Sequence, residues 1–267
     1  MIRGKNKHID VDLSKVPSGY GSGLLELPDD QMLARTSHLQ TFSEVKPGLM
    51  IPRSEWVERA ARSAKAYRDD VQEIKDQGNE GACVGAASAQ MLETTLRRRY
   101  GKRHWVPLSG MSIYKRIGRS AQSGAIIPDG MDAVIEGVLP LDTLANKARY
   151  SHTHPFTGWS KPLPDGWAQT AQQFRGQRFA IAKGTDEIVS ALLNGYVGIV
   201  GRQGHAIPYI YADFSNGKPV AAYANSWGEW GDGGFGYDSE AILRNIACYI
   251  LVDVVTRLEL EIPVLGD

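Results

Sequence analysis

The clearest pattern of hydrophobic and polar positions lies between residues 83 and 100, CVGAASAQMLETTLRRRY. Small and apolar residues recur there every three or four positions, as on one face of a helix, at Val84, Ala87, Met91 and Thr95. Gly101 follows directly and is a natural helix end. The three arginines at 97–99 favourably counter the helix dipole, which is a simpler interpretation than a nucleic-acid patch. The pattern predicts a helix over residues 83–100.

Weaker signals predict further helices on either side of this one. A segment beginning at Ser54 has a residue typical of a helix N-cap, followed by good helix formers up to Tyr67. Shorter helices are expected over 109–119, 131–138 and 186–193, whereas 145–180 shows little periodicity. The C-terminal third changes to β-branched and aromatic runs, which predict strands over 195–200, 206–212, 220–224 and 246–255. Helices first and antiparallel strands later indicate an α+β fold, with two lobes that meet at a cleft.

The dipeptide Asn216-Gly217 strongly favours a tight hairpin turn between two of these strands. With Ser215 opposite Lys218, every pair of facing positions has numbers that sum to 433. This register brings His205 and Asn225 within about one strand pair of each other at the open end of the hairpin.

The first 50 residues are rich in Gly, Pro, Ser and charge and show no sustained period. We expect residues 1–50 to form an extended N-terminal arm, draped over the body or over a partner, and residues 51–267 to form one domain. The glycines at 19, 21 and 23 predict a flexible turn, since no strand precedes them and no helix clearly follows, as a phosphate loop would require.

Charge and composition exclude several classes of protein. Thirty basic residues balance thirty acidic ones, so no global field favours nucleic acid or a membrane as partner. No signal peptide or apolar span is recognised, which favours a cytoplasmic protein, and only two cysteines occur, which favours a reducing compartment. His152 and His154 form an isolated pair that predicts a solvated loop, so neither a metal nor a cofactor is expected.

Cys83 is the candidate nucleophile because it begins the best helix of the chain. Unsatisfied N–H groups and the dipole of a first helical turn favour the thiolate, which is the reactive form of cysteine. The preceding glycine-rich turn, residues 78–82, leaves little bulk around the sulfur. A base and a group that orients the base would complete the site, and the hairpin offers His205 and Asn225 for these roles. Cys248, in an apolar run, is interpreted as a buried and inert thiol.

Three blocks between residues 71 and 237 resemble those of papain-like cysteine proteases, in the order of that family. They are Gln77-Gly-Asn-Glu-Gly-Ala-Cys83, Gly204-His205-Ala206 and Asn225-Ser226-Trp227-Gly228, the last followed by Trp230-Gly231 and Gly234. The resemblance implies a two-lobed fold, with the nucleophile helix in one lobe and His and Asn in a β-rich lobe. It also implies that the catalytic residues are Cys83, His205, Asn225 and, as the oxyanion-hole glutamine, Gln77. Trp227 would shield the Asn–His hydrogen bond, and the backbone of Asp129-Gly130 would bind an extended substrate.

The sequence departs from the family pattern near the site. Val84 stands where the family has a tryptophan, and Glu80 replaces a disulfide cysteine and would raise the pKa of the thiol if it lay close to the sulfur. Only residues 201–204 separate strand 195–200 from His205, where family members have a long segment that contacts substrate. The substrate preference of the family therefore does not transfer to this chain.

Two functions are compatible with these residues. The first is a cysteine peptidase that hydrolyses peptide bonds of a peptide or protein substrate through a Cys83 thioester. The alternative is a papain-fold structural or binding protein with little catalysis, associated with a bacteriophage virion or another assembly that the N-terminal arm would bind. The absence of the long amphipathic helices of the family's inhibitory propeptide from residues 1–70 favours the alternative, whereas the complete set of Cys, His, Asn and Gln favours the peptidase.

Overall fold

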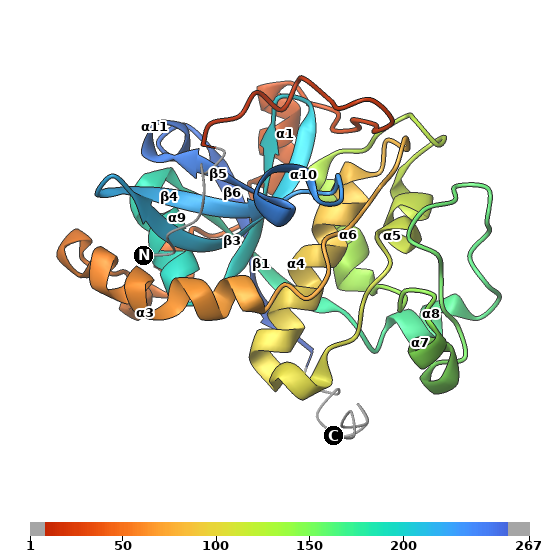
Figure 1. Cartoon of the computed structure of the whole chain (residues 1–267). Helices are drawn as coiled ribbons and strands as arrows, with labels where there is room; N and C mark the ends of the chain where they lie inside the picture. The colour runs from red at the N-terminus through yellow and green to blue at the C-terminus, as the bar shows by residue number, and fades with distance from the viewer. Residues whose placement is uncertain (1–8, 256–267) are drawn as a thin grey trace.

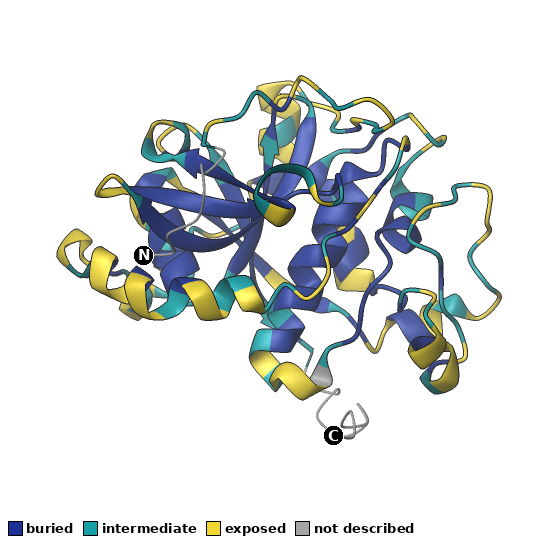
Figure 2. Ribbon diagram, viewed as in Figure 1, coloured by how far each residue is buried: buried dark blue, intermediate teal, exposed yellow. Residues whose placement is uncertain are grey.

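The computed structural model describes residues 9–255, apart from the side chain of His104. Its central element is helix α4, Cys83–Tyr100, which ends at Gly101 with a positive φ of 91°. The predicted boundaries are thus confirmed, and Gly101 takes a backbone conformation that other residues adopt only with strain. Buried residues occur on every face of α4 rather than along one stripe, and polar Ser88, Gln90 and Glu93 are among them. The helix therefore passes through the middle of the molecule (Figures 1 and 2).

The other helices near α4 form the first lobe. Helices α5, Gly110–Ile117, and α6, Ile127–Glu136, pack against α4, and short helices α7, Leu144–Arg149, and α8, Trp167–Ala171, follow in the loops beyond them. Glycines allow the close packing of α5 on α4, because a Cβ at Gly85 would overlap the Gly110 carbonyl. The short 3-10 turn η3, Lys102–His104, follows α4.

The second lobe is built on a six-stranded antiparallel sheet with the order β1-β6-β2-β3-β4-β5. Its strands are β1 Gly176–Lys183, β2 Val197–Arg202, β3 His205–Ser215, β4 Lys218–Ala224, β5 Phe235–Ser239 and β6 Ala247–Val254. Strands β2, β3, β4 and β6 lie where the sequence predicted strands. Strands β1 and β5 were missed, since neither has a run of alternating positions longer than a few residues.

Side chains from the two faces of the sheet enter two separate hydrophobic clusters. One face, with Ile199, Tyr211 and Leu251, packs against α4. The other face, with Val200, Tyr209 and Ile250, packs against helix α9, Gly184–Leu193, and the start of helix α3, Trp56–Asp69. Alternation along each strand explains this division, because successive side chains point to opposite faces. The exception is the irregularity in β3, where the neighbours Ile210 and Tyr211 both enter the cluster beside α4. Short helices α10, Trp230–Gly233, and α11, Glu240–Leu243, flank β5.

The hairpin between β3 and β4 forms as predicted at its turn but not at its open end. Asn216 and Gly217 both have positive φ, and positions summing to 433 face each other from Ser215 to Tyr211. A one-residue shift follows, so that Tyr209 faces Tyr223. The predicted register would place His205 opposite Gly228, but the β3–β4 pairing ends at Tyr209. On the other side of β3, His205 faces Arg202 of β2.

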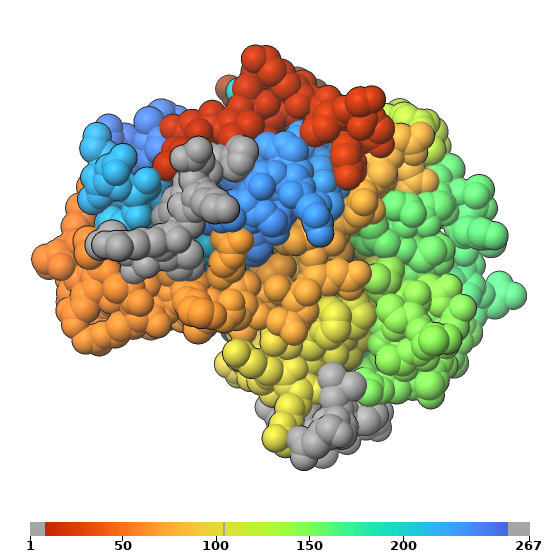
Figure 3. Space-filling model, in the orientation of Figure 1, coloured from red at the N-terminus to blue at the C-terminus, as the bar shows by residue number. Residues whose placement is uncertain are grey.

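Residues 9–50 are more structured than the extended arm predicted from the sequence. They contain α1, Asp29–Thr36, α2, Phe42–Val45, and the 3-10 turn η1, Pro47–Leu49; a second turn, η2 Arg53–Glu55, precedes α3, so Ser54 is not its N-cap. Leu13 and Phe42 are completely buried in the cluster beside α9. The start of this segment forms a red band across the top of the two lobes (Figure 3). Contacts with residues far away in the chain hold this segment in place. For this reason the local periodicity of its sequence did not reveal its structure.

Candidate active site

Cys83 is the first residue of α4, and the chain before it makes no side-chain cap on the helix. The sulfur is approached by the backbone N–H groups of Val84, Gly23 and Ala206 as well as its own. These donors favour the thiolate, but the complete burial of Cys83 outweighs them and raises the pKa of the thiol from 9.0 to about 11. In this closed arrangement Cys83 is therefore a neutral thiol at neutral pH.

His205 begins β3 and is the neighbour of Ala206, whose N–H reaches the Cys83 sulfur. Its Nε2 donates to Oδ1 of Asn225 at 2.8 Å, and the same Oδ1 accepts the Ser226 N–H at 2.7 Å. Nδ1 has no hydrogen-bond partner among residues 9–255, although it is buried. Burial is the main cause that lowers the pKa of His205 to about 4, against the opposite effect of Asn225. The imidazole is thus neutral, with one nitrogen held and the other available.

Trp227 covers the imidazole from one side. The ring centroids of Trp227 and His205 are 4.4 Å apart with an interplanar angle of 27°, and Trp227 is only 1% exposed. The indole thereby keeps water away from the bond between His205 and Asn225, which strengthens that bond. Trp227 also contacts the rings of Trp230 and of Tyr20, the latter from the N-terminal segment.

Gln77 is held on both sides of its amide. Its Oε1 accepts the Ser226 hydroxyl at 2.5 Å, and its Nε2 donates to the carbonyl oxygens of Glu80 at 2.7 Å and Gly21 at 3.2 Å. The backbone N–H of Gln77 also donates to the Ser226 carbonyl at 2.9 Å. Ser226, which the sequence analysis gave no role, therefore fixes the orientation of the Gln77 amide and links the two lobes beside Cys83.

Glu80 does not affect the sulfur in the way the sequence suggested. Its carboxylate accepts the backbone N–H groups of Gly158, at 3.1 and 3.3 Å, and Trp159, at 2.7 Å. Burial and backbone donors account for the shifted pKa of Cys83, and Glu80 is not among the causes. The acid instead ties the loop at 158–159 to the turn that leads into α4.

The predicted substrate-binding pair Asp129-Gly130 does not form an extended edge. Both residues lie inside α6, where Asp129 pairs with Arg35 at 2.8 Å and Gly130 packs closely on α4. The Gly130 N–H donates to the Ile126 carbonyl at the start of the helix, so it is not free for an extended peptide. The extended backbone near Cys83 is Ala125, whose N–H and C=O both bond to the N-terminal segment.

Residues 20–25 of the N-terminal segment lie directly over these groups. Gly21 accepts from Gln77, Gly23 is buried beside Cys83, and Leu24 donates to the Gly204 carbonyl at 3.0 Å. The site is consequently closed, with Cys83, Gln77 and His205 all at 0% exposure. Gly21 and Gly23 are the residues of the sequence that could have indicated this close passage over the site, although a flexible turn was predicted there.

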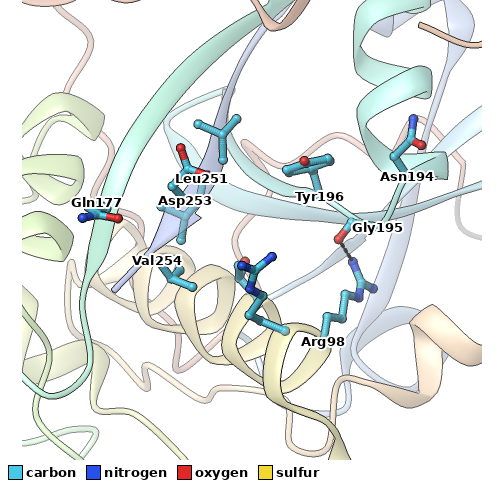
Figure 4. Close-up of a pocket in the computed structure, with 11 residues that line it drawn as sticks. Arg98, Gln177, Asn194, Gly195, Tyr196, Leu251, Asp253 and Val254 are labelled. Carbon is cyan, nitrogen blue, oxygen red and sulfur yellow. Dashed lines mark hydrogen bonds between the residues drawn. The ribbon is translucent and has the colours of Figure 1, made fainter. Parts of the chain in front are cut away.

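Other candidate positions lie outside this site. The pocket in Figure 4, about 300 Å³, is lined by Arg98, Gly195 and Asp253 among others, and Arg98 bonds to the Gly195 carbonyl at its wall. His154 is buried, with its two ring nitrogens beside the carbonyls of Pro155 and Lys161, so the predicted solvated loop is wrong for this residue. Among residues 9–255 no group of three or more His, Cys, Asp and Glu side chains could hold a metal ion. Over the same range, no helix has the length and apolar character needed to cross a membrane.

Comparisons with known proteins find similarity in structure. No family model matches the sequence, and no curated protein matches it. Xylellain, a cysteine protease from Xylella fastidiosa, is similar with a TM-score of 0.59 at 16% identity, over 89% of this chain and 97% of xylellain. Digestive procathepsin L2 proteinase from Tenebrio molitor gives 0.55 at 16% identity over 70% and 67% of the two chains. Recombinant stem bromelain precursor gives 0.54 at 15% identity over 88% and 84%.

These similarities define the fold of the chain. It is the two-lobed α+β fold of papain-like cysteine proteases, as the three sequence blocks implied. Helix α4, which begins with Cys83, lies in one lobe, and His205 and Asn225 lie in the β-rich lobe.

Proposed function

We propose that this protein is a cysteine peptidase in which Cys83 is the nucleophile and His205 the general base. The hydrogen bond from His205 to Asn225 beneath Trp227 carries the proposal, because it leaves Nδ1 as the one ring nitrogen able to exchange a proton with the thiol. A histidine buried only for packing would have little need of an oriented and shielded ring.

The first half of the reaction acylates the enzyme. Nδ1 of His205 takes the thiol proton, and Sγ of Cys83 attacks the carbonyl carbon of a peptide bond. The oxygen that becomes negative is stabilised by the backbone N–H of Cys83 and by Nε2 of Gln77, whose orientation is fixed by Ser226. The intermediate collapses as the imidazolium gives its proton to the leaving amine, and an acyl thioester remains on Cys83.

The second half returns the enzyme to its starting state. His205 removes a proton from water, the hydroxide attacks the thioester, and the same proton returns to the departing Cys83 sulfur. Asn225 holds the ring in one tautomer through both halves but does not transfer a proton itself.

A structural or binding role is the second candidate, and the closed site favours it. With Cys83 at 0% exposure, no substrate reaches the sulfur in this arrangement. The groups that close the site belong to the chain's own residues 20–25 and not to filled-in core, so the machinery beneath them is intact. For this reason we favour the peptidase.

The test is hydrolysis of a pool of fluorogenic peptides by the wild-type chain, by Gly23→Ala and by each of these with Cys83→Ala. In Gly23→Ala the added methyl group overlaps the Gly81 backbone and displaces the residues that close the site, so absence of hydrolysis by this variant would also contradict the proposal. Loss of the nucleophile is expected to lower the rate about a thousandfold or more. Cys248→Ala is the matched control, since it removes the other thiol from a site distant in sequence and on the opposite face of the sheet, and its rate should equal that of wild type. Hydrolysis that persists in Cys83→Ala would contradict the proposal.

A further inference from the structure

Residues 225–234, between β4 and β5, form a loop that carries two of the groups on which the proposed site depends. Asn225 accepts the Nε2 proton of His205, and Trp227 covers the imidazole. The Asn225 N–H donates to the Gly234 carbonyl at 2.8 Å, so the loop closes on itself at its base. A displacement of this loop would therefore release the imidazole and expose it to water.

The backbone of the loop contributes little rigidity of its own. Four of its residues have positive φ, namely Gly228, Gly231, Gly233 and Gly234. Within the short helix α10, Gly231 and Asp232 have backbone angles that are not helical. Because glycine loses more conformational freedom on folding than other residues, a loop of this composition depends on contacts from outside to keep one conformation.

Arg68, in the last turn of α3, makes such contacts from outside the loop. Its Nη1 donates to Oδ2 of Asp232 at 2.9 Å, and its Nη2 donates to the carbonyl oxygen of the same residue at 2.8 Å. One guanidinium thus holds both the side chain and the backbone of Asp232. The planar fork of arginine permits this double contact, whereas the single ammonium of lysine does not.

The guanidinium of Arg68 is itself fixed by the aromatic residues of β5. It lies over the ring of Phe235, 4.3 Å from the centroid, and donates to the Tyr237 hydroxyl at 2.9 Å. The Tyr237 hydroxyl in turn donates to Oδ2 of Asp232 at 3.0 Å. The side chains of Arg68 and Asp232 are 22% and 29% exposed, so their ion pair is screened less by solvent than an ordinary surface pair.

The segment that follows Arg68 contacts the same loop as it approaches the active site. Ile74 lies against Gly234 so closely that a Cβ on the glycine would overlap it. Asp76 forms a backbone bridge with Trp227. Arg68 is therefore the outer end of a line of contacts between residues 68–77 and the loop, and the inner end of this line lies at the active site.

We propose that Arg68 is a positioning residue, which holds the loop 225–234 against α3 and so keeps the imidazole of His205 oriented and shielded. Arg68 contacts none of the groups proposed to react, so it acts only through the loop. The inference rests on the proposed peptidase function for its catalytic meaning, but its effect on His205 is measured without any turnover.

The experiment measures by NMR how fast the Nε2 proton of His205 exchanges with water, in the full chain labelled with a nitrogen isotope. In the wild type this proton is bound to Asn225 beneath Trp227, so its exchange should be slow. In Arg68→Ala the loop loses its outer attachment, and the exchange should become about tenfold faster or more. Arg59→Ala is the matched control, because Arg59 lies on the same helix and pairs with Glu55, and it should exchange as the wild type does.

The backbone amide of Ile250 distinguishes positioning from a general loss of stability. Ile250 is completely buried in β6, between β1 and β2, so its N–H exchanges only when the sheet opens. We expect Arg68→Ala to accelerate exchange at His205 and to leave Ile250 at its wild-type rate. Equal acceleration at both sites would mean that Arg68 serves only the stability of the fold, which would overturn the proposal.

Two further variants test whether Arg68 acts through Asp232. Asp232→Ala should match Arg68→Ala, and the double variant should exchange no faster than either, because both changes remove the same contact. Multiplied effects in the double variant would overturn the proposed role. Arg68→Lys keeps the charge but only one of the two contacts, so its exchange at His205 should lie between those of the wild type and Arg68→Ala. It also decides the question if Arg68→Ala does not fold.

The outcomes separate the role of Arg68 from the peptidase. Faster exchange at His205 in Arg68→Ala, without peptide hydrolysis by any variant, supports the positioning role and contradicts the proposed function. Wild-type exchange at His205 in Arg68→Ala and Arg68→Lys, together with hydrolysis that depends on Cys83, overturns the positioning role and leaves the peptidase standing.

Discussion

Cys83 and Cys248 are both completely buried, yet their burial is made in different ways. Cys248 lies within β6, paired on both sides by β1 and β2, and its sulfur packs against Gly198. Cys83 lies at a helix start, where the ends of several elements meet, and backbone groups from Gly23 and Ala206 complete its enclosure. Burial raises the pKa of both thiols.

The difference teaches that exposure alone does not distinguish a reactive thiol from an inert one. To expose Cys248, the sheet must come apart, which costs about the whole free energy of unfolding. We expect Cys83 to become exposed when residues 20–25 leave, because they are the part of its enclosure that belongs neither to α4 nor to the sheet. The two cysteines therefore serve as internal references for each other.

The largest expected effect on the difference between Cys83 and Cys248 is a change in how the alkylation rate of Cys83 depends on pH. When Gly23→Ala removes the enclosure, the pKa of Cys83 should fall from about 11 to 9.0 or below, since burial is the largest cause of its rise. At pH 8 the thiolate fraction would then increase about a hundredfold. Because the closed form holds the thiol proton more tightly, rising pH between 9 and 11 should also weaken the binding of residues 20–25 over the wild-type site.

Below neutral pH, protonation of His205 is expected to determine how the closure of the site depends on pH. Its pKa of about 4 in the closed form lies below the ordinary 6.5, so an opened form binds a proton more readily and closure weakens as the pH falls from 6.5 to 4. Alkylation rates from pH 6 to 11, and hydrogen exchange of residues 20–25 at lower pH, measure the two sides. Superimposable profiles of wild type and Gly23→Ala would refute this account of the shift.

A smaller effect is expected from Asn225→Ala. The His205 Nε2–H loses its acceptor and the ring loses its orientation, so kcat/KM in a Gly23→Ala background should fall about ten- to a hundredfold. The loss should be less than that of His205→Ala, because His205 transfers the proton and Asn225 only orients it. Asn245→Ala, which removes an exposed amide, is the control. Equal losses for Asn225→Ala and Asn245→Ala would exclude an orienting role.

The smallest effect is expected from Cys248→Ala. Removing a sulfur from a filled core should lower the free energy of unfolding by about 1 kcal/mol without changing the alkylation rate of Cys83. Urea denaturation measures the first quantity and mass spectrometry the second. Faster alkylation of Cys83 in this variant would mean that residues 20–25 and the sheet open together, and the contrast between the two cysteines would be lost.

Much of the fold was predictable where neighbours in the chain determine it. The boundaries of α4 followed from helix formers and a terminal glycine, and the β3–β4 turn from Asn216-Gly217. The register failed beyond Tyr211, where a local shift depends on packing against other strands. Strand β1 was missed because its place at the sheet edge is decided by pairing with β6.

The sequence alone determined which side chains are available for chemistry and where their elements begin. Helix propensity and turn preference act over a few residues, so Cys83 at a helix start and a hairpin that brings the regions of His205 and Asn225 together followed from local patterns, although the exact register at its open end did not. Only the tertiary structure decided that Glu80 holds the 158–159 loop, that Ser226 orients Gln77, and that the N-terminal segment lies over the site. Each of these is a contact between residues far apart in the chain, and such contacts depend on the shape of two surfaces that exist only after folding.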